Sequence, residues 1–135
     1  MTQGQDLCGV DGRGGKFSAS TEVWRDVCDI DDLQPNSGVC ALVDGQQVAL
    51  FYLTPSAVCH AINNYDPFGH ANVLSRGVIG DINGQPVVAS PLYKQHFNLQ
   101  TGVCLEDETV KIPVYAIRIN NNRVEINMQE SGNEL

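Results

Sequence analysis

The sequence contains no long apolar run. Across its 135 residues, no stretch reaches the roughly 18 consecutive apolar residues that mark a membrane-spanning helix, so no membrane span is expected. Its beginning also lacks the basic start and apolar core of a secretory signal. Basic residues are scarce, with 8 Lys and Arg against 16 Asp and Glu and a formal net charge of −8. Because nucleic-acid phosphates require a basic face, DNA and RNA are not expected partners.

Closely spaced cysteines are also missing. The five cysteines are odd in number and form no short pair of the kind that marks a zinc ribbon or a thioredoxin-like site. Most of them fall in apolar, strand-like runs, where a free thiol behaves as a small hydrophobic side chain. The pattern predicts reduced, buried thiols in a cytoplasmic protein. The five are Cys8, Cys28, Cys40, Cys59 and Cys104.

The usual arrangements of catalytic and metal-binding residues are absent as well. The histidines show no His-x-x-x-His spacing, and the adjacent Cys59 and His60 would point to opposite faces of a strand. Ser90, His96 and Asp66 could form a Ser-His-Asp set, but no nucleophile elbow or oxyanion hole accompanies them. The glycine-rich stretch near the start follows no strand, as a phosphate-binding loop would. The sequence therefore predicts no catalytic, metal or cofactor site in this chain.

The sequence does contain a series of β-hairpin signals. Asp44-Gly45 and Asn83-Gly84 each separate two strand-like runs, and such dipeptides are strong hairpin signals. A third hairpin is expected around Asn121-Asn122. No helical period is sustained, so an all-β domain of about ten short antiparallel strands is predicted. The pattern does not separate a β-sandwich from a partly open barrel.

Two of these strand-like runs give more detail. Between Gln46 and Leu53 both faces are largely apolar, which is typical of a central strand. Pairing the last hairpin about its turn places Ile117 opposite Ile126 and Arg118 opposite Glu125, so that apolar pairs share one face. The folded domain is predicted over residues 21–128. Residues 1–20 and 129–135 are polar and glycine-containing, and they are expected to be flexible tails.

Two proline-containing loops follow strands and could face each other. The first contains Asp66-Pro67-Phe68, and the second lies within Pro86–Gly102, where Ser90-Pro91 precedes a polar run. Together with a strand before the first loop, a glycine-bearing hairpin between them and Phe-x-Leu-x-Thr-Gly after the second, this order resembles the Rieske iron–sulfur family. In that family each loop supplies one Cys and one His to a two-iron cluster. The resemblance implies a Rieske-like fold in which the two loops protrude.

The four positions that hold the cluster in the Rieske family are all changed here. They carry Asp66, Phe68, Ser90 and Tyr93, whereas both prolines and the Phe-x-Leu-x-Thr-Gly residues are kept. Carboxylate, phenyl, hydroxyl and phenol do not reproduce thiolate and imidazole ligands. A cluster is therefore not expected, and a Rieske-type electron carrier is the least favoured function.

Longer runs resemble the small subunits of NAD(P)H-dependent nitrite reductases. They are Pro35–Leu42, Asp66–Phe68, Ala71–Gly77 and Ala89–Phe97. The resemblance implies an accessory subunit of a cytoplasmic oxidoreductase that reduces nitrite to ammonium. Its partner would be a large subunit carrying flavin, an iron–sulfur cluster and sirohaem. The alternative is a cluster-free Rieske-fold binding or scaffold module for another partner, since fold does not fix function.

Two expectations concern the loops. We expect Phe68 and either Leu92 or Tyr93 to fill the space of the missing cluster, with Asp66 accepting a hydrogen bond from Ser90. Exposed loop residues are the candidate partner interface, although they could equally be an ordinary solvated surface, and Tyr93 could equally be core filler. The candidate interface residues are Arg76, Tyr93, Lys94, Gln95 and His96.

Overall fold

The structure is a computed structural model that describes residues 23–131, and it confirms the all-β prediction. Within those residues there is no α-helix, only the 3-10 turns η2 (Ile30–Asp32) and η3 (Leu74–Arg76). No described helix is long and apolar enough to cross a membrane. The strands are β2 (Trp24–Asp29), β3 (Gly38–Val43), β4 (Gln46–Leu53), β5 (Val58–Asn63), β6 (Tyr65–Asp66), β7 (Ala71–Asn72), β8 (Val78–Ile82), β9 (Gln85–Ala89), β10 (His96–Asn98), β11 (Val114–Asn120) and β12 (Arg123–Ser131).

The three predicted hairpins are present. Asp44-Gly45 joins β3 to β4 and Asn83-Gly84 joins β8 to β9, and all four residues have positive φ, between 50° and 81°. Two-residue turns of this kind match the right-handed twist of the strands that they join. In the third hairpin, β11 and β12 pair with Ile117 opposite Ile126 and Arg118 opposite Glu125, as predicted.

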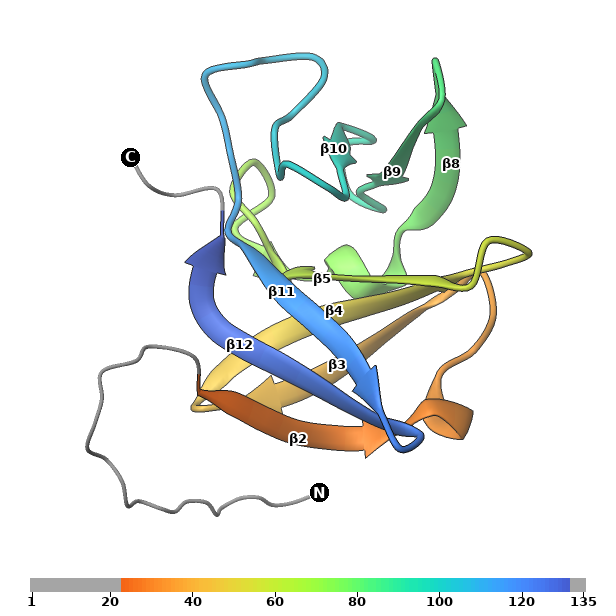
Figure 1. Ribbon diagram of the computed structural model, residues 1–135. Helices are drawn as coiled ribbons and strands as arrows, with labels where there is room; N and C mark the ends of the chain where they lie inside the picture. The colour runs from red at the N-terminus through yellow and green to blue at the C-terminus, as the bar shows by residue number, and fades with distance from the viewer. Residues whose placement is uncertain (1–22, 132–135) are drawn as a thin grey trace.

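Six of the strands form one strongly curved sheet in the order β2-β12-β11-β5-β4-β3 (Figure 1). Its two edge strands approach each other, and Nε of Arg25 in β2 lies 3.0 Å from Oδ2 of Asp44 in the β3–β4 turn. The sheet is therefore a nearly closed barrel, which decides between the two predicted architectures. The barrel forms the lower part of the molecule in Figure 1.

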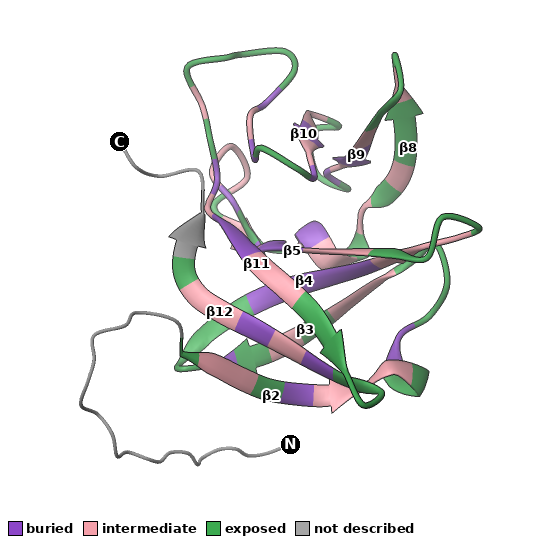
Figure 2. Ribbon diagram, viewed as in Figure 1, coloured by how far each residue is buried: buried purple, intermediate pink, exposed green. Residues whose placement is uncertain are grey.

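A second, three-stranded sheet in the order β10-β9-β8 lies above the barrel (Figure 1). The core is accordingly divided into two apolar clusters. Val48 and Leu50 of β4 pack into the barrel cluster, whereas Ala49 and Phe51 pack into the cluster beneath the small sheet. Figure 2 shows the resulting buried stretch along β4. As predicted for this strand, both of its faces are apolar because both are covered.

Two details differ from the sequence-based expectation. Strand β12 continues to Ser131, so residues 129–131 belong to the sheet and not to a tail. Residues 1–20 and 132–135 lie outside the described part of the chain. Among the described cysteines only Cys104 is buried, while Cys40 is exposed and Cys28 and Cys59 are intermediate. Alternation in these strands turns some thiols away from the core, so the expectation of generally buried thiols was wrong.

Candidate functional site

The first loop is a narrow hairpin built around a buried carboxylate. Strands β6 and β7 pair on either side of it, and the side chain of Asp66 is fully buried. Oδ1 of Asp66 accepts hydrogen bonds from the backbone N–H groups of Phe68 (2.8 Å) and Gly69 (3.2 Å). An aspartate that bonds the backbone two and three residues ahead holds a turn closed. Asp66 therefore fixes the shape of the first loop.

The second loop, Ser90–Gln95, joins β9 to β10 and is closed by its own backbone. The Ser90 N–H donates to the carbonyl of Gln95 (2.9 Å), and the Lys94 N–H donates to the carbonyl of Ser90 (3.1 Å). Lys94 has a φ of 68°, a left-handed conformation that is unusual for a residue with a side chain. The surrounding backbone hydrogen bonds keep Lys94 in this strained conformation, so the second loop has a defined shape.

The two loops meet at a junction with a buried polar centre, which we define as Asp66, Phe68, Gly69, Ser90 and Leu92. The Ser90 hydroxyl donates to Oδ2 of Asp66, and both side chains are fully buried. The predicted hydrogen bond is thus confirmed. Breaking a buried hydrogen bond leaves its donor and acceptor unsatisfied, which is costly, so this contact ties the loops together.

Apolar side chains close the junction on two sides. Phe68 packs against the core, with its ring centroid 6.1 Å from that of Phe97. Leu92 lies over Gly69, where an added Cβ would collide with Cδ1 of the leucine. Of the two residues predicted to fill this space beside Phe68, Leu92 contacts the first loop at Gly69 but remains 44% exposed. Tyr93 is 64% exposed and does not act as core filler.

The donor set at the junction does not fit an iron–sulfur cluster. The carboxylate and the hydroxyl at two of the four ligand positions are bonded to each other, and the phenyl group at the third packs on Phe97. Thiolate and imidazole are the ligands that such clusters use. Within residues 23–131 there is also no group of three or more His, Cys, Asp or Glu side chains that could hold a metal ion.

Beyond the junction lies the tip surface, which we define as Arg76, Tyr93, Lys94, Gln95 and His96. The last four follow one another along the second loop into β10, and Tyr93 and Lys94 are exposed. Arg76 ends η3 and is exposed, and its neighbour Gly77 packs against the carbonyl of Ala89, directly before the second loop. The structure thus brings the predicted interface residues to one end of the small sheet.

The cations of the tip surface differ from those of the barrel. Arg25, Arg118 and Arg123 each form an ion pair with a carboxylate. Arg76 and Lys94 have no ion-pair partner among the described residues. In a chain with a net charge of −8, two uncompensated cations at one end form a local site for acidic groups.

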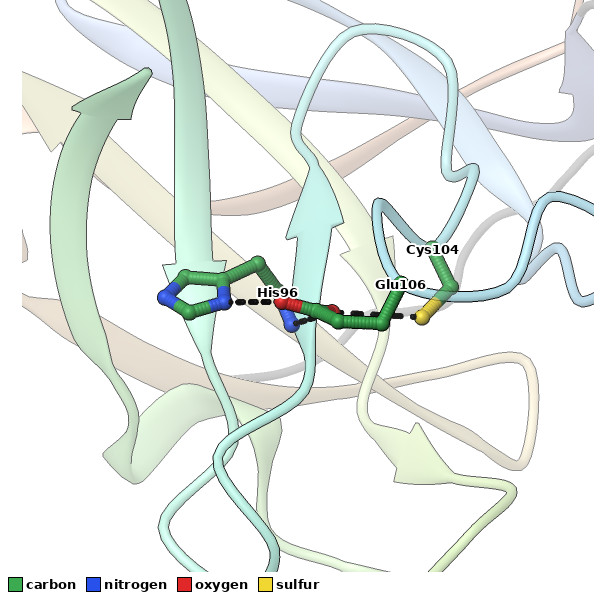
Figure 3. Close-up of polar contacts among 3 residues, drawn as sticks. All are labelled: His96, Cys104 and Glu106. Atoms are coloured by element: carbon green, nitrogen blue, oxygen red, sulfur yellow. Dashed lines mark hydrogen bonds and ion pairs between the residues drawn. The ribbon is translucent and has the colours of Figure 1, made fainter.

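His96 is anchored at the base of the tip surface by Glu106 (Figure 3). Oε1 of Glu106 accepts from the His96 backbone N–H (2.8 Å), and Oε2 lies 2.6 Å from Nδ1 of the ring. The Cys104 thiol also reaches Oε1 of Glu106, at 3.6 Å. Burial raises the pKa of the Glu106 carboxyl, but the hydrogen bonds from His96 outweigh it and hold that pKa below its ordinary value. Burial raises the pKa of the Cys104 thiol, which therefore stays protonated and is not an activated nucleophile.

The conceivable Ser-His-Asp set is only partly assembled. Ser90 donates to Asp66 directly, whereas His96 pairs with Glu106. A catalytic serine would instead donate to the imidazole that removes its proton. His60, which is half-buried in β5, has a pKa lowered by burial and takes no part in either loop. The geometry thus provides no nucleophile.

Two positioning residues were missed by the sequence interpretation. Glu106 lies in the acidic run Glu106-Asp107-Glu108, which belongs to no recognisable motif. Asn64, directly before the first loop, is buried, and its amide bonds Oε1 of Gln47 (3.1 Å) while its Oδ1 accepts from the Ser75 N–H (2.7 Å). It thereby attaches η3 to the barrel. In the sequence, only the position of Asn64 directly before the first loop could have indicated this role.

Comparisons with known proteins agree with this geometry. A family model described as a Rieske-like [2Fe-2S] domain matches residues 23–127. The nitrite reductase (NADH) small subunit of Salmonella typhimurium (strain LT2) is 47% identical over 103 residues, covering 76% of this chain and 95% of that protein. The NMR structure of the Escherichia coli protein NirD is similar, with a TM-score of 0.75 and 43% identity, and the match covers 82% of this chain and 100% of that one.

A further relative places the same domain in a longer polypeptide. The nitrite reductase [NAD(P)H] large subunit of Klebsiella oxytoca is 32% identical over 116 residues, which cover 86% of this chain and 12% of that protein. The match to the small subunits, by contrast, spans nearly their whole length. The chain therefore belongs to the Rieske-like domain family and, within it, to the family of nitrite reductase (NADH) small subunits.

Proposed function

We propose that this protein is the accessory subunit of a cytoplasmic NAD(P)H-dependent nitrite reductase and supports the reduction of nitrite to ammonium by a large subunit. The observation that carries the proposal is the 47% identity to a nitrite reductase (NADH) small subunit over 95% of that protein's length. Flavin, an iron–sulfur cluster and sirohaem would belong to the large subunit. The side chains of the junction support the assignment of these cofactors to the large subunit, because they do not suit an iron–sulfur cluster.

The tip surface is the proposed docking site for the large subunit. Its exposed Tyr93 is a residue type enriched in interface hot spots, and backbone hydrogen bonds close the loop that carries it. Arg76 and Lys94 supply cations that form no ion pair with a carboxylate of residues 23–131. The partner surface is therefore expected to carry acidic groups.

The Klebsiella oxytoca relative supports an equimolar complex. There, a segment homologous to this chain is part of one polypeptide named as a large subunit. A covalent arrangement of this kind keeps the two parts at a high effective concentration. By analogy, one copy of this chain would bind one large subunit.

The proposal is tested by co-expression with the large subunit of the same organism. We expect the two chains to co-purify in equal amounts and the complex to oxidise NADH or NADPH in the presence of nitrite. The chain purified alone should be colourless. Failure to bind the large subunit, with binding to some other protein, would favour the scaffold alternative, and a visible absorbance from the isolated chain would reopen the electron-carrier function.

Two double variants with the same change in net charge test whether the tip surface is the docking site. Arg76→Gln with Lys94→Gln removes two positive charges at the tip surface, and we expect about tenfold weaker binding that depends less on salt. Asn120→Asp with Asn121→Asp changes the net charge equally at the β11–β12 turn, which lies at the lower edge of the barrel, away from the small sheet (Figure 1). Equal effects of the two pairs would mean that net charge, not the tip surface, governs binding.

A further inference from the structure

The tautomer of His96 is fixed by its contacts. Nδ1 lies 2.6 Å from a carboxylate oxygen of Glu106, and a carboxylate can only accept. In the neutral imidazole the single ring proton must then reside on Nδ1, because the hydrogen bond of one nitrogen decides the state of the other. Nε2 is left with a free lone pair. Figure 3 shows this nitrogen on the side of the ring that faces away from Glu106.

The surroundings hold this ring in one orientation while leaving it accessible. Glu106 also accepts the backbone N–H of His96, and the Leu105 N–H donates to the His96 carbonyl (2.8 Å). The His96 side chain is nevertheless 33% exposed, and no residue of the described chain is bonded to Nε2. A polar atom that is both oriented and unpaired is suited to a directional contact with another molecule.

The strand register places an apolar neighbourhood beside this nitrogen. Val78, Ala89 and His96 are direct partners across β8, β9 and β10, so their side chains share one face of the small sheet. Val78 is 70% exposed, and it lies about 10 Å from His96, two strand spacings away. The second loop, with Tyr93, begins and ends at this same row. An apolar area with one oriented acceptor resembles the centre of a protein interface.

We propose that Nε2 of His96, oriented by Glu106, is a hydrogen-bond acceptor for a donor group of the large subunit, within an interface that extends over Val78, Ala89 and Tyr93. This inference rests on the proposed function and specifies its contact chemistry. Glu106 is a positioning residue, since it acts through the imidazole. The acidic run that follows β10 thereby gains a role in recognition.

The first experiment needs only the isolated full-length chain. Two-dimensional ¹H–¹⁵N NMR at alkaline pH reports which ring nitrogen of each histidine carries the proton. We expect the Nδ1-protonated form to predominate for His96. In Glu106→Gln the amide can donate to Nδ1, so the Nε2-protonated form should increase, whereas Glu108→Gln, two residues along in an exposed position, should leave the spectrum unchanged. Predominance of the Nε2-protonated form in the unsubstituted chain would overturn the proposal.

The second experiment measures affinity for the large subunit. His96→Asn keeps a donor at the position of Nδ1 but has no acceptor at Nε2, whereas His96→Gln restores an acceptor at about the position of Nε2. We expect His96→Asn to weaken binding about tenfold, the loss of one hydrogen bond, and His96→Gln to weaken it less. Glu106→Gln should weaken binding, and Glu108→Gln should not. Normal binding by His96→Asn would overturn this inference alone, whereas no binding by the unsubstituted chain would overturn the proposed function as well.

Discussion

The buried junction and the exposed tip surface come from the same two loops but differ in what surrounds them. Ser90 is fully buried and bonded to Asp66, whereas Tyr93, in the same loop, is 64% exposed. The junction occupies the place where the resemblance to Rieske proteins would put a metal cluster, and it joins the loops through a carboxylate, a hydroxyl and apolar side chains. Different residues of the same two loops therefore fix the shape of the loops and form their exposed surface.

The substitution Asp66→Ala tests the difference between the junction and the tip surface most directly. The substitution leaves the N–H groups of Phe68 and Gly69 and the Ser90 hydroxyl without their buried acceptor. We expect a loss of about 3 kcal/mol in the free energy of unfolding, measured by urea denaturation. Tyr93→Ala, on the exposed side, should change it by less than about 0.5 kcal/mol. Similar losses in both variants would show that the two regions are not distinct.

Phe68→Ala tests the apolar side of the junction. Phe68 is partly buried against the core and its ring is close to that of Phe97. Because the side chain is not fully buried, we expect a cost of about 2 kcal/mol, below the range for completely buried phenylalanines. Urea denaturation measures it, with Phe68→Leu as the control that keeps most of the volume. A cost as small as that of Tyr93→Ala would mean that Phe68 does not support the loops.

Gly69→Ala tests the contact between Gly69 in the first loop and Leu92 in the second loop. The new methyl group would collide with Leu92, whose flexible side chain can turn toward solvent. We expect about 1 kcal/mol of destabilisation, together with a change in the NMR methyl signals of Leu92. Restoring stability by the additional change Leu92→Ala would confirm the steric cause. An additive result from the double variant would contradict it.

The smallest effect concerns the pH dependence of the pair formed by His96 and Glu106. The pKa of Glu106 is lower in the folded protein than its ordinary value of 4.5. Its stabilising contribution is therefore present above that value and is lost as the pH falls through the lowered pKa. Since the carboxyl is 48% exposed, we expect only a few tenths of a kcal/mol between the unsubstituted chain and Glu106→Gln at pH 7. In urea denaturation at pH 3 this difference should shrink, and a difference that grows would contradict the assignment.

Much of the fold could be predicted because its signals are local. Asp44-Gly45 and Asn83-Gly84 favour the turns that they form, and alternation along the last hairpin determines its register. The contact between Asp66 and Ser90 could be predicted only because the resemblance brought two distant loops together. The pairing of Glu106 with His96 and the burial of Asn64 depend on how loops pack on the barrel, which no short sequence pattern encodes. The exposed thiol of Cys40 has a different cause, since alternation along β3 turns its side chain away from the core.

Strand β4 contributes alternate side chains to both apolar clusters, Val48 and Leu50 to one and Ala49 and Phe51 to the other. Because β4 lies between the two apolar clusters, unfolding of either cluster would expose one face of this strand, and the unfolding of the two clusters is therefore coupled. The domain is thereby made cooperative, although its core is divided. The same strand supports the barrel on one face and the cluster beneath the small sheet on the other, so we expect the two parts to unfold together.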